Sequence, residues 1–221
     1  MAEVPAGLAE DRDRALQLTP VSRETLARLD RFVEIFLAQQ QRMNLIARSS
    51  IPQLWTRHIA DSLQLLPLAN ATVSTWVDLG SGGGFPGLVI ACAMAERPNA
   101  VVHLVESTKK KAAFLAEAAR HIGAPAIVHP VRIEDFVKNF DVRPDAITAR
   151  ALAPLEQLLA LAYPLSKTGA QSLFPKGQDV ESELTKAAKY WKFEPILVPS
   201  KTNPLSRIVI VGHWERRDTK R

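Results

Sequence analysis

Apolar positions along the first 70 residues follow the spacing of buried helix faces. Between Val21 and Met43 they recur every three or four residues, and Ser22 stands where a serine caps the start of a helix. A second stripe of this kind continues to Leu66. Ser50 is placed to cap it, and Pro52 is tolerated in a first helical turn. This pattern predicts a helical extension over residues 1–70.

After residue 70 the pattern changes to short β-branched runs that alternate with helical segments. The predicted strands cover residues 75–79, 101–106, 126–131, 145–149, 171–175, 195–199 and 207–212. Such alternation favours a mainly parallel sheet with helices on both faces. Only residues 200–206 separate the last two strands. This is too short for a crossover helix, so these strands should pair antiparallel at one edge.

The chain is therefore expected to be an α/β protein with one main domain over residues 71–215. Its sheet should have seven strands, mostly parallel, with an antiparallel last strand. The helical extension, residues 1–70, should pack on this domain, and a basic tail covers residues 216–221. We expect residues 1–20 and the chain after Trp214 to be flexible.

Composition excludes several kinds of site. The apolar fraction of 47% suits an ordinary globular core. The single cysteine, Cys92, excludes an intrachain disulfide and a multi-cysteine zinc site, and the scattered histidines suggest no metal. The first residues are acidic where a secretion signal would be basic, and no apolar run approaches the ~18 residues that span a bilayer. We expect a cytoplasmic protein with no membrane contact.

The formal charge of +5 adds a hint about partners. Basic residues gather in three places, which are Arg42, Arg48 and Arg57; Lys109, Lys110 and Lys111; and Arg216, Arg217, Lys220 and Arg221. Each group alone is typical of a solvated surface. Together on one face they would indicate a phosphate-rich partner such as RNA.

The most informative segment is a glycine-rich turn over residues 76–87, between a predicted strand and a predicted helix. In such folds a ligand lies beyond the carboxyl ends of the strands, and glycines such as Gly80 and Gly82 let the backbone approach it. Glu106 ends the next strand, where its carboxylate can accept both ribose hydroxyls of an adenosine. The sequence predicts a nucleoside-containing cofactor.

Two cofactor classes compete for this loop. Gly82, Gly84 and Gly87 satisfy the dinucleotide pattern G-x-G-x-x-G, which indicates an oxidoreductase. Asp78, however, should then face a pyrophosphate, and two unit charges at 4 Å repel by about 4 kcal/mol at an effective dielectric of 20. Pro86 also removes a backbone donor that a phosphate would use. These features favour S-adenosylmethionine, which has no phosphate and carries positive charge.

Several ordered motifs extend beyond the loop. They are MNLI at 43–46, RHIADS at 57–62, DLGSGGGFPG at 78–87, ES at 106–107 with KK at 109–110, RIEDF at 132–136, TARA at 148–151 and KG at 176–177. With these motifs the chain resembles the small-subunit ribosomal RNA methyltransferase G family, also called glucose-inhibited division protein B. Members transfer a methyl group to guanine N7 in 16S rRNA on a Rossmann-like class I methyltransferase fold.

The resemblance implies cofactor contacts at Gly80, Phe85, Ile133, Glu134 and Arg150. It also implies 16S rRNA or the small ribosomal subunit as partner, and we expect the chain to act as a monomer. Two positions depart from the family. Thr148 stands where a serine is usual, which keeps the hydroxyl, and Pro175 precedes Lys176 and Gly177, which affects the path of the fifth strand and the direction of Lys176.

Missing motifs narrow the acceptor. Cys92 lies in an apolar run and is a poor thiolate nucleophile for pyrimidine C5, and an Asp/Asn-Pro-Pro-aromatic loop for exocyclic amines is absent after the fourth strand. Guanine N7 has an available lone pair, so its methylation needs alignment more than a base. A dinucleotide oxidoreductase and a non-catalytic RNA-binding assembly module remain as alternatives.

The remaining site assignments are hypotheses about RNA and alignment. We place Arg150 and Lys176 at the reaction site, because the planar guanidinium of Arg150 suits a phosphate or a guanine edge. RNA contacts are expected from Arg57, His58, Lys176, Lys109 and Lys110. An alternative for Arg57 and His58 is local pairing with Asp61 at helical spacing.

Overall fold

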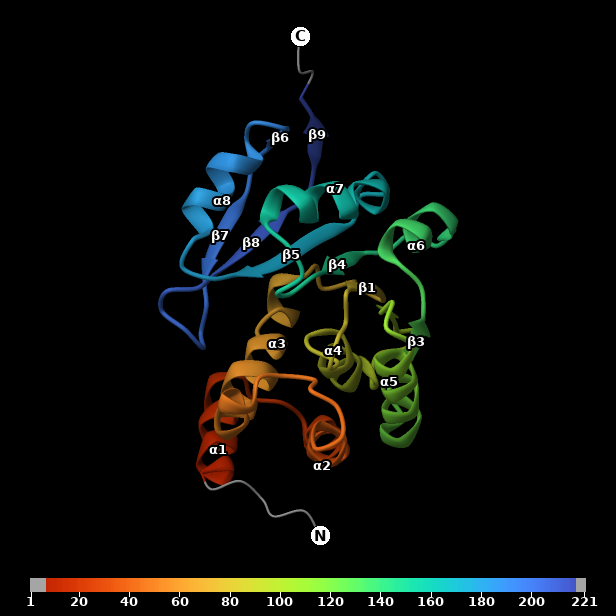
Figure 1. The fold of residues 1–221 in the computed structure, drawn as a ribbon, viewed down its shortest axis with the longest axis vertical. Coiled ribbons are helices and arrows are strands. Elements are labelled where there is room, and N and C mark those ends of the chain that lie inside the picture. Colours follow the sequence, from red (N-terminus) through yellow and green to blue (C-terminus); the bar gives the residue numbers. More distant parts are fainter. Residues whose placement is uncertain (1–6, 218–221) are drawn as a thin grey trace.

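A seven-stranded sheet runs through the middle of the molecule (Figure 1). The computed structural model describes residues 7–217. The strand order is β3-β2-β1-β4-β5-β8-β7. The strands are β1 (Thr75–Leu79), β2 (Val101–Val105), β3 (Ala126–His129), β4 (Ala146–Thr148), β5 (Gln171–Lys176), β7 (Ile196–Pro199) and β8 (Arg207–Val211). Strands β3, β2, β1, β4 and β5 are parallel, whereas β8 is antiparallel to both β5 and β7. The predicted strands and the antiparallel edge pair are confirmed, with ends that differ by at most two residues.

Helices cover both faces of this sheet. On one face lie α4 (Gly87–Met94) and α5 (Lys109–Ile122), together with the N-terminal helices. On the other lie α6 (Ile133–Asn139), α7 (Leu155–Ser166) and α8 (Val180–Ala187). Side chains of β1 alternate between the two cores, because Trp76 joins the first cluster and Val77 and Leu79 join the second.

The N-terminal extension consists of two long helices and a series of short turns. Its long helices are α1 (Leu8–Leu18) and α2 (Arg23–Gln40). The predicted cap is confirmed, because Ser22 Oγ accepts a hydrogen bond from Thr25 N at 3.1 Å. The expectation of flexibility for residues 1–20 is wrong for α1, whose buried Leu8 and Ala15 join the first core cluster. Residues 1–6 lie outside the described residues.

The second predicted helix is instead a run of short, differently wound segments. It comprises η1 (Arg48–Gln53), η2 (Trp55–Ala60), α3 (Asp61–Leu63) and η3 (Leu66–Leu68), of which η2 is a π-helix. Ser50 does not cap it, because Ser50 Oγ donates to Ala47 O. The cap is the buried Asp11 of α1, whose Oδ2 accepts from Trp55 N and Thr56 N at 2.8 and 3.0 Å.

A two-stranded sheet near the carboxyl end was not predicted. Strands β6 (Trp191–Phe193) and β9 (Trp214–Arg216) pair antiparallel, and Arg217 N donates to Tyr190 O. Trp214 is 1% exposed and its Nε1 donates to Leu159 O, which fixes β9 on the second core. The expected flexibility after Trp214 is therefore wrong for residues 215–217, and residues 218–221 lie outside the described part.

Candidate active site

The main cavity lies beyond the carboxyl ends of β1, β2 and β4 and encloses about 750 Å³. The glycine loop, Glu106, the start of α6 and the segment after β4 form its walls. Sequence-predicted residues in its lining are Arg57, His58, Gly80, Gly82, Phe85, Glu106, Ile133, Glu134 and Arg150. The fold thus brings nine predicted positions to one cavity.

The glycine loop is held by backbone and by Glu106. Gly80 N and Ser81 N both donate to Val105 O of the neighbouring strand. Gly80 and Gly82 have φ angles of 73° and 54°, a left-handed conformation that favours glycine. Glu106 Oε2 accepts from Gly82 N at 3.0 Å, and its Oε1 accepts from Thr108 N at 2.7 Å. These bonds fix the carboxylate at the cavity wall and leave lone pairs available for ribose hydroxyls.

Asp78 does not face the cavity. Its carboxylate is 1% exposed and lies under the loop, where Oδ2 accepts from Gly87 N and Oδ1 accepts from Thr148 Oγ1 at 2.7 Å. Burial raises the pKa of Asp78 to about 6, although the bonds from Thr148, Ser81 and Gly87 oppose the rise. The expected repulsion of a pyrophosphate by Asp78 was therefore wrong, and its role here is to anchor the loop.

An aromatic cluster closes the side of the cavity next to the N-terminal extension. The ring of Phe85 lies 5.5 Å from Phe32, 5.1 Å from Phe36 and 4.9 Å from His58, measured between ring centroids. The Arg150 guanidinium carbon lies 5.6 Å from the centre of the Phe85 ring, a cation–π distance. This packing holds the glycine loop, the extension and Arg150 together.

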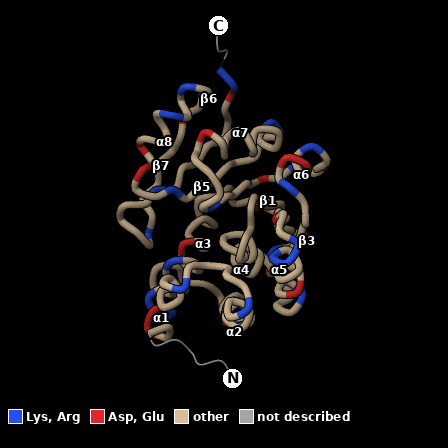
Figure 2. The backbone as a smooth tube through the Cα atoms, in the orientation of Figure 1, with Lys and Arg blue, Asp and Glu red and all other residues tan. Residues whose placement is uncertain are grey.

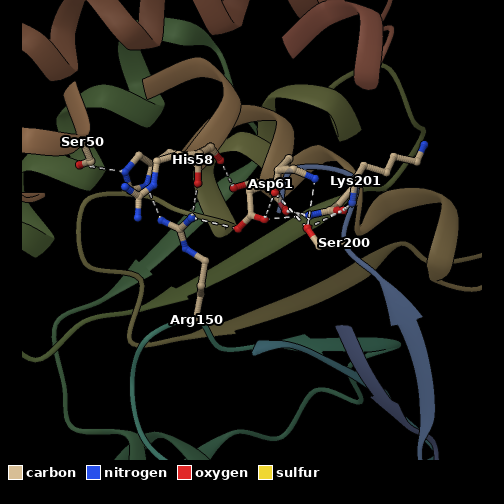
Figure 3. Close-up of polar contacts among 10 residues, drawn as sticks. Ser50, His58, Asp61, Arg150, Ser200 and Lys201 are labelled. Carbon is tan, nitrogen blue, oxygen red and sulfur yellow. Dashed lines mark hydrogen bonds and ion pairs between the residues drawn. The ribbon is translucent and has the colours of Figure 1, made fainter. Parts of the chain in front are cut away.

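The Arg150 side chain makes three hydrogen bonds in the wall of this cavity (Figure 3). Its Nη1 donates to Arg57 O at 3.0 Å and to Asp61 Oδ2 at 3.2 Å, and its Nη2 donates to His58 Nδ1 at 2.6 Å. Arg150 and Asp61 side chains are each 16% exposed, so their ion pair is largely shielded from solvent. The predicted guanidinium at this position is therefore firmly oriented.

His58 is held as a neutral acceptor. Burial, with the charges of Arg150 and Arg57, lowers the pKa of His58 to about 3. Its other nitrogen, Nε2, lies 3.3 Å from Ser50 Oγ. The alternative of local pairing of Arg57 and His58 with Asp61 is not what the structure has, because His58 and Asp61 both bind Arg150.

A second cavity of about 760 Å³ adjoins the first and shares Arg57, His58, Arg150 and Ala151 with it. Lys176 lines this second cavity, where its Nζ lies 2.6 Å from Glu183 Oε2 and donates to Ala153 O at 3.0 Å. The structure thus places Lys176 away from the glycine loop and across Arg150 from it.

Some of the basic residues near α5 line the main cavity, and the others lie on the exposed surface. Lys109 and Lys110 are exposed at the start of α5 and do not line the main cavity. Lys111 and Arg132 line it, and Figure 2 shows Lys and Arg around the start of α5 and next to α6.

Among residues 7–217, no group of three His, Cys, Asp or Glu is arranged to hold a metal ion. In the same range no helix is long and apolar enough to cross a membrane.

Sequence reasoning missed Asp61 as a site residue, and also Thr202 and Gln64. Asp61 lies within the motif at 57–62, so a marker was present, but its partner Arg150 is 89 residues away. Thr202 and Gln64 lie in no motif, and neither carries an ionised group that would draw attention to it.

Solved structures with similar folds include an rRNA methylase. Cofactor-bound Rv0187 from MTB aligns with a TM-score of 0.60 at 11% identity, covering 95% of this chain and 99% of that one. A putative rRNA-methylase from Clostridium thermocellum aligns with a TM-score of 0.51 at 12% identity, covering 67% and 91%. At these identities the likeness shows the fold, which is the predicted class I methyltransferase fold with its N-terminal helical extension.

Sequence relatives are much more similar. A protein of Bradyrhizobium sp. (strain ORS 278) called ribosomal RNA small subunit methyltransferase G is 59% identical over 95% of this chain and 94% of its own length. One of the same name from Nitrobacter hamburgensis is 57% identical over 95% of this chain and 80% of its own. The family profile for rRNA small subunit methyltransferase G matches residues 25–207. The chain belongs to the ribosomal RNA small subunit methyltransferase G family.

Proposed function

We propose that this chain transfers a methyl group from S-adenosylmethionine to N7 of a guanine in 16S ribosomal RNA. The observation that carries the proposal is the pair of adjoining cavities with Arg150 in their common wall. A methyl donor and its acceptor must meet across a shared boundary, and these cavities are of the size that binds small molecules. The family membership supplies the reaction class and the ribosomal substrate.

The residues of the main cavity fit S-adenosylmethionine. Glu106 offers a fixed carboxylate to the ribose, and the half-buried Ile133 and the nearby Leu152 offer apolar surface to the adenine. The open backbone at Gly82, where an added Cβ would meet only Gly80 O at 3.8 Å, leaves room for close approach. Glu134, exposed in the first turn of α6, is assigned to the edge of the base.

Bound there, S-adenosylmethionine would supply an electrophilic methyl group on a sulfonium, so no proton has to be removed from N7. What remains for the protein is alignment and charge. Arg150 orients the acceptor from the common wall, and its guanidinium is in turn oriented by His58, Asp61 and the Arg57 carbonyl. Neutral His58 adds no positive charge beside a base that becomes cationic as the methyl bond forms.

The wider assignments follow from the same reading. Exposed Arg57, Lys109 and Lys110 would contact RNA phosphates, and Lys176 would contact RNA from the second cavity. We further propose that the chain acts as a monomer in the cytoplasm. The N-terminal extension then works as one unit with the methyltransferase domain, because Gly83 lies so close to Phe36 that an added Cβ would be 3.1 Å from the ring.

Transfer of a labelled methyl group tests the proposal. Purified small ribosomal subunits lacking the modification are incubated with the enzyme and methyl-labelled S-adenosylmethionine, then digested to nucleosides. Label should appear as N7-methylguanosine and be lost in Gly80→Asp, because the left-handed backbone at Gly80, with a φ of 73°, is strained by any side chain and the added group would also displace Leu152 Cδ1, 2.8 Å away. Tight cofactor binding without label would instead support the non-catalytic RNA-binding alternative. Binding of NADH with no binding of S-adenosylmethionine would support the oxidoreductase.

A further inference from the structure

One carboxylate connects three separate segments around the second cavity. Asp61 Oδ2 accepts from Arg150 Nη1 at 3.2 Å, and Oδ1 accepts from Thr202 Oγ1 and Gln64 Nε2, both at 2.8 Å (Figure 3). Arg150 follows β4, and Thr202 lies in the loop between β7 and β8. Asp61 thus joins the wall shared by the two cavities to a loop on the far side of the second one.

The β7–β8 loop, residues 200–206, is also bonded to Gln64, which lies in the same segment as Asp61. Gln64 Oε1 accepts from Lys201 N at 2.8 Å, and Gln64 Nε2 donates to Ser200 Oγ at 3.2 Å. Ser200, Thr202 and Asn203 line the second cavity, while Lys201 and Asn203 are exposed. The loop therefore lines the second cavity, where the methyl acceptor would bind, and is also accessible to a large substrate.

The chemistry of N7 methylation makes the orientation of Arg150 decisive. A bidentate contact of Arg150 to guanine O6 and N7 would engage the lone pair that must attack the methyl group. The guanidinium can therefore donate to O6 or to a phosphate but not to N7. Of its five N–H donors, three already form hydrogen bonds to Asp61, His58 and Arg57 O. Within residues 7–217, the Nε–H and one Nη2–H have no recorded partner, and they are left for the acceptor.

We propose that Asp61 is a positioning residue for methyl transfer, which fixes Arg150 and the β7–β8 loop relative to each other. This inference rests on the proposed function and adds a role that touches neither cofactor nor guanine. The loop that meets the RNA and the guanidinium that orients the base share one carboxylate. RNA bound at Lys201 and Asn203 is thereby placed in register with Arg150.

Asp61→Asn and Thr202→Val separate the two halves of this connection. Asparagine at 61 keeps an acceptor for Thr202 but faces Arg150 Nη1 with an N–H donor or an uncharged oxygen. Valine at 202 removes the loop bond and leaves the Asp61–Arg150 pair in place, and Thr202→Ser restores the hydroxyl. Asp30→Asn is the matched control, because it breaks the Arg12–Asp30 pair of the same extension, whose two bonds of 2.7 Å involve no residue that lines either cavity.

We expect kcat of Asp61→Asn on small subunits to fall by about 10- to 100-fold, with the dissociation constant of S-adenosylmethionine changed by less than about threefold. Thr202→Val should raise KM for subunits more than it lowers kcat, and Thr202→Ser should recover it. In nuclear magnetic resonance the His58 ring should titrate at higher pH in Asp61→Asn, because Arg150 is released from it. Asp30→Asn should change melting temperature alone.

A kcat of Asp61→Asn within about twofold of wild type would overturn the proposal. A loss of kcat that Asp30→Asn reproduces at equal melting temperature would do so too, because the role would be structural. If wild-type protein transferred no label, the proposed function would fail instead. The His58 titration would then still decide whether Asp61 positions Arg150, since it needs no RNA.

Discussion

Replacement of Asp78 by asparagine should change how stability depends on pH. Asp78 is 1% exposed, and burial raises its pKa from 3.8 to about 6. The folded protein therefore holds this proton more tightly than the unfolded chain. The contribution of this bound proton to the free energy of unfolding is fully present below pH 4 and is lost as pH rises through 6. The full rise in the pKa of Asp78 corresponds to about 3 kcal/mol of folding stability, of which about 1.3 kcal/mol is lost between pH 5 and pH 7.

Asparagine at 78 removes this titration. It can keep the bond from Gly87 N, and it can replace the bond that Thr148 Oγ1 donates by one of reversed direction, from its own Nδ2 to Thr148 Oγ1. The free energy of unfolding of Asp78→Asn minus that of wild type should thus increase by about 1.3 kcal/mol from pH 5 to pH 7. Urea unfolding of both proteins across this range measures it, and other titrating groups cancel in the difference. A difference that stays constant or decreases with pH would refute the assignment of Asp78 as a buried carboxyl whose pKa is raised by burial.

Three further predictions concern packing and charge. Gly87→Ala places a Cβ 2.5 Å from Asp78 Oδ2, so we expect a loss of about 1–3 kcal/mol in urea unfolding together with weaker cofactor binding; unchanged stability would contradict the close packing. Asp11→Ala leaves Trp55 N and Thr56 N without their cap, which should cost about 2–3 kcal/mol, and a loss below 0.5 kcal/mol would show that Asp11 does not hold η2. His58, with its pKa lowered to about 3, should stay neutral in the folded protein from pH 8 to pH 5 when its ring is followed by nuclear magnetic resonance. The free energy of unfolding should fall as pH drops below 6.5, because only the unfolded chain takes up a proton on His58 there. A titration midpoint of His58 near 6.5 in the folded protein would contradict this.

Local patterns were enough to predict the sheet and much of the cavity. The strands follow from runs of β-branched residues, and the order of a mostly parallel sheet then brings Gly80, Glu106 and Arg150 to the same edge. Alternation along β1 could also have corrected the error about Asp78. Val77 and Leu79 face one core, so Asp78 must face the other, on the side of Trp76 and α4.

Contacts between distant segments could not be predicted. The cap of η2 comes from Asp11, 44 residues before Trp55, so no local pattern reveals that the helix restarts there. For the same reason Ser50 resembled a cap, although its hydroxyl turns back to Ala47 O. The chain after Trp214 was expected to be flexible, but it pairs with β6, and the indole of Trp214 is buried on a core that only tertiary structure assembles.

Binding of S-adenosylmethionine to Gly82→Asn, compared with Gly123→Asn, tests most directly whether the main cavity holds the methyl donor. Both glycines are left-handed, with φ of 54° and 63°, a conformation that asparagine tolerates. Gly82 lines the cavity, whereas Gly123 ends α5 in open space. By calorimetry at equal melting temperature, we predict at least about a tenfold weaker affinity for Gly82→Asn and wild-type affinity for Gly123→Asn, as the loss of a few close contacts implies. Undiminished binding by Gly82→Asn would contradict the account, because the cofactor would then lie elsewhere.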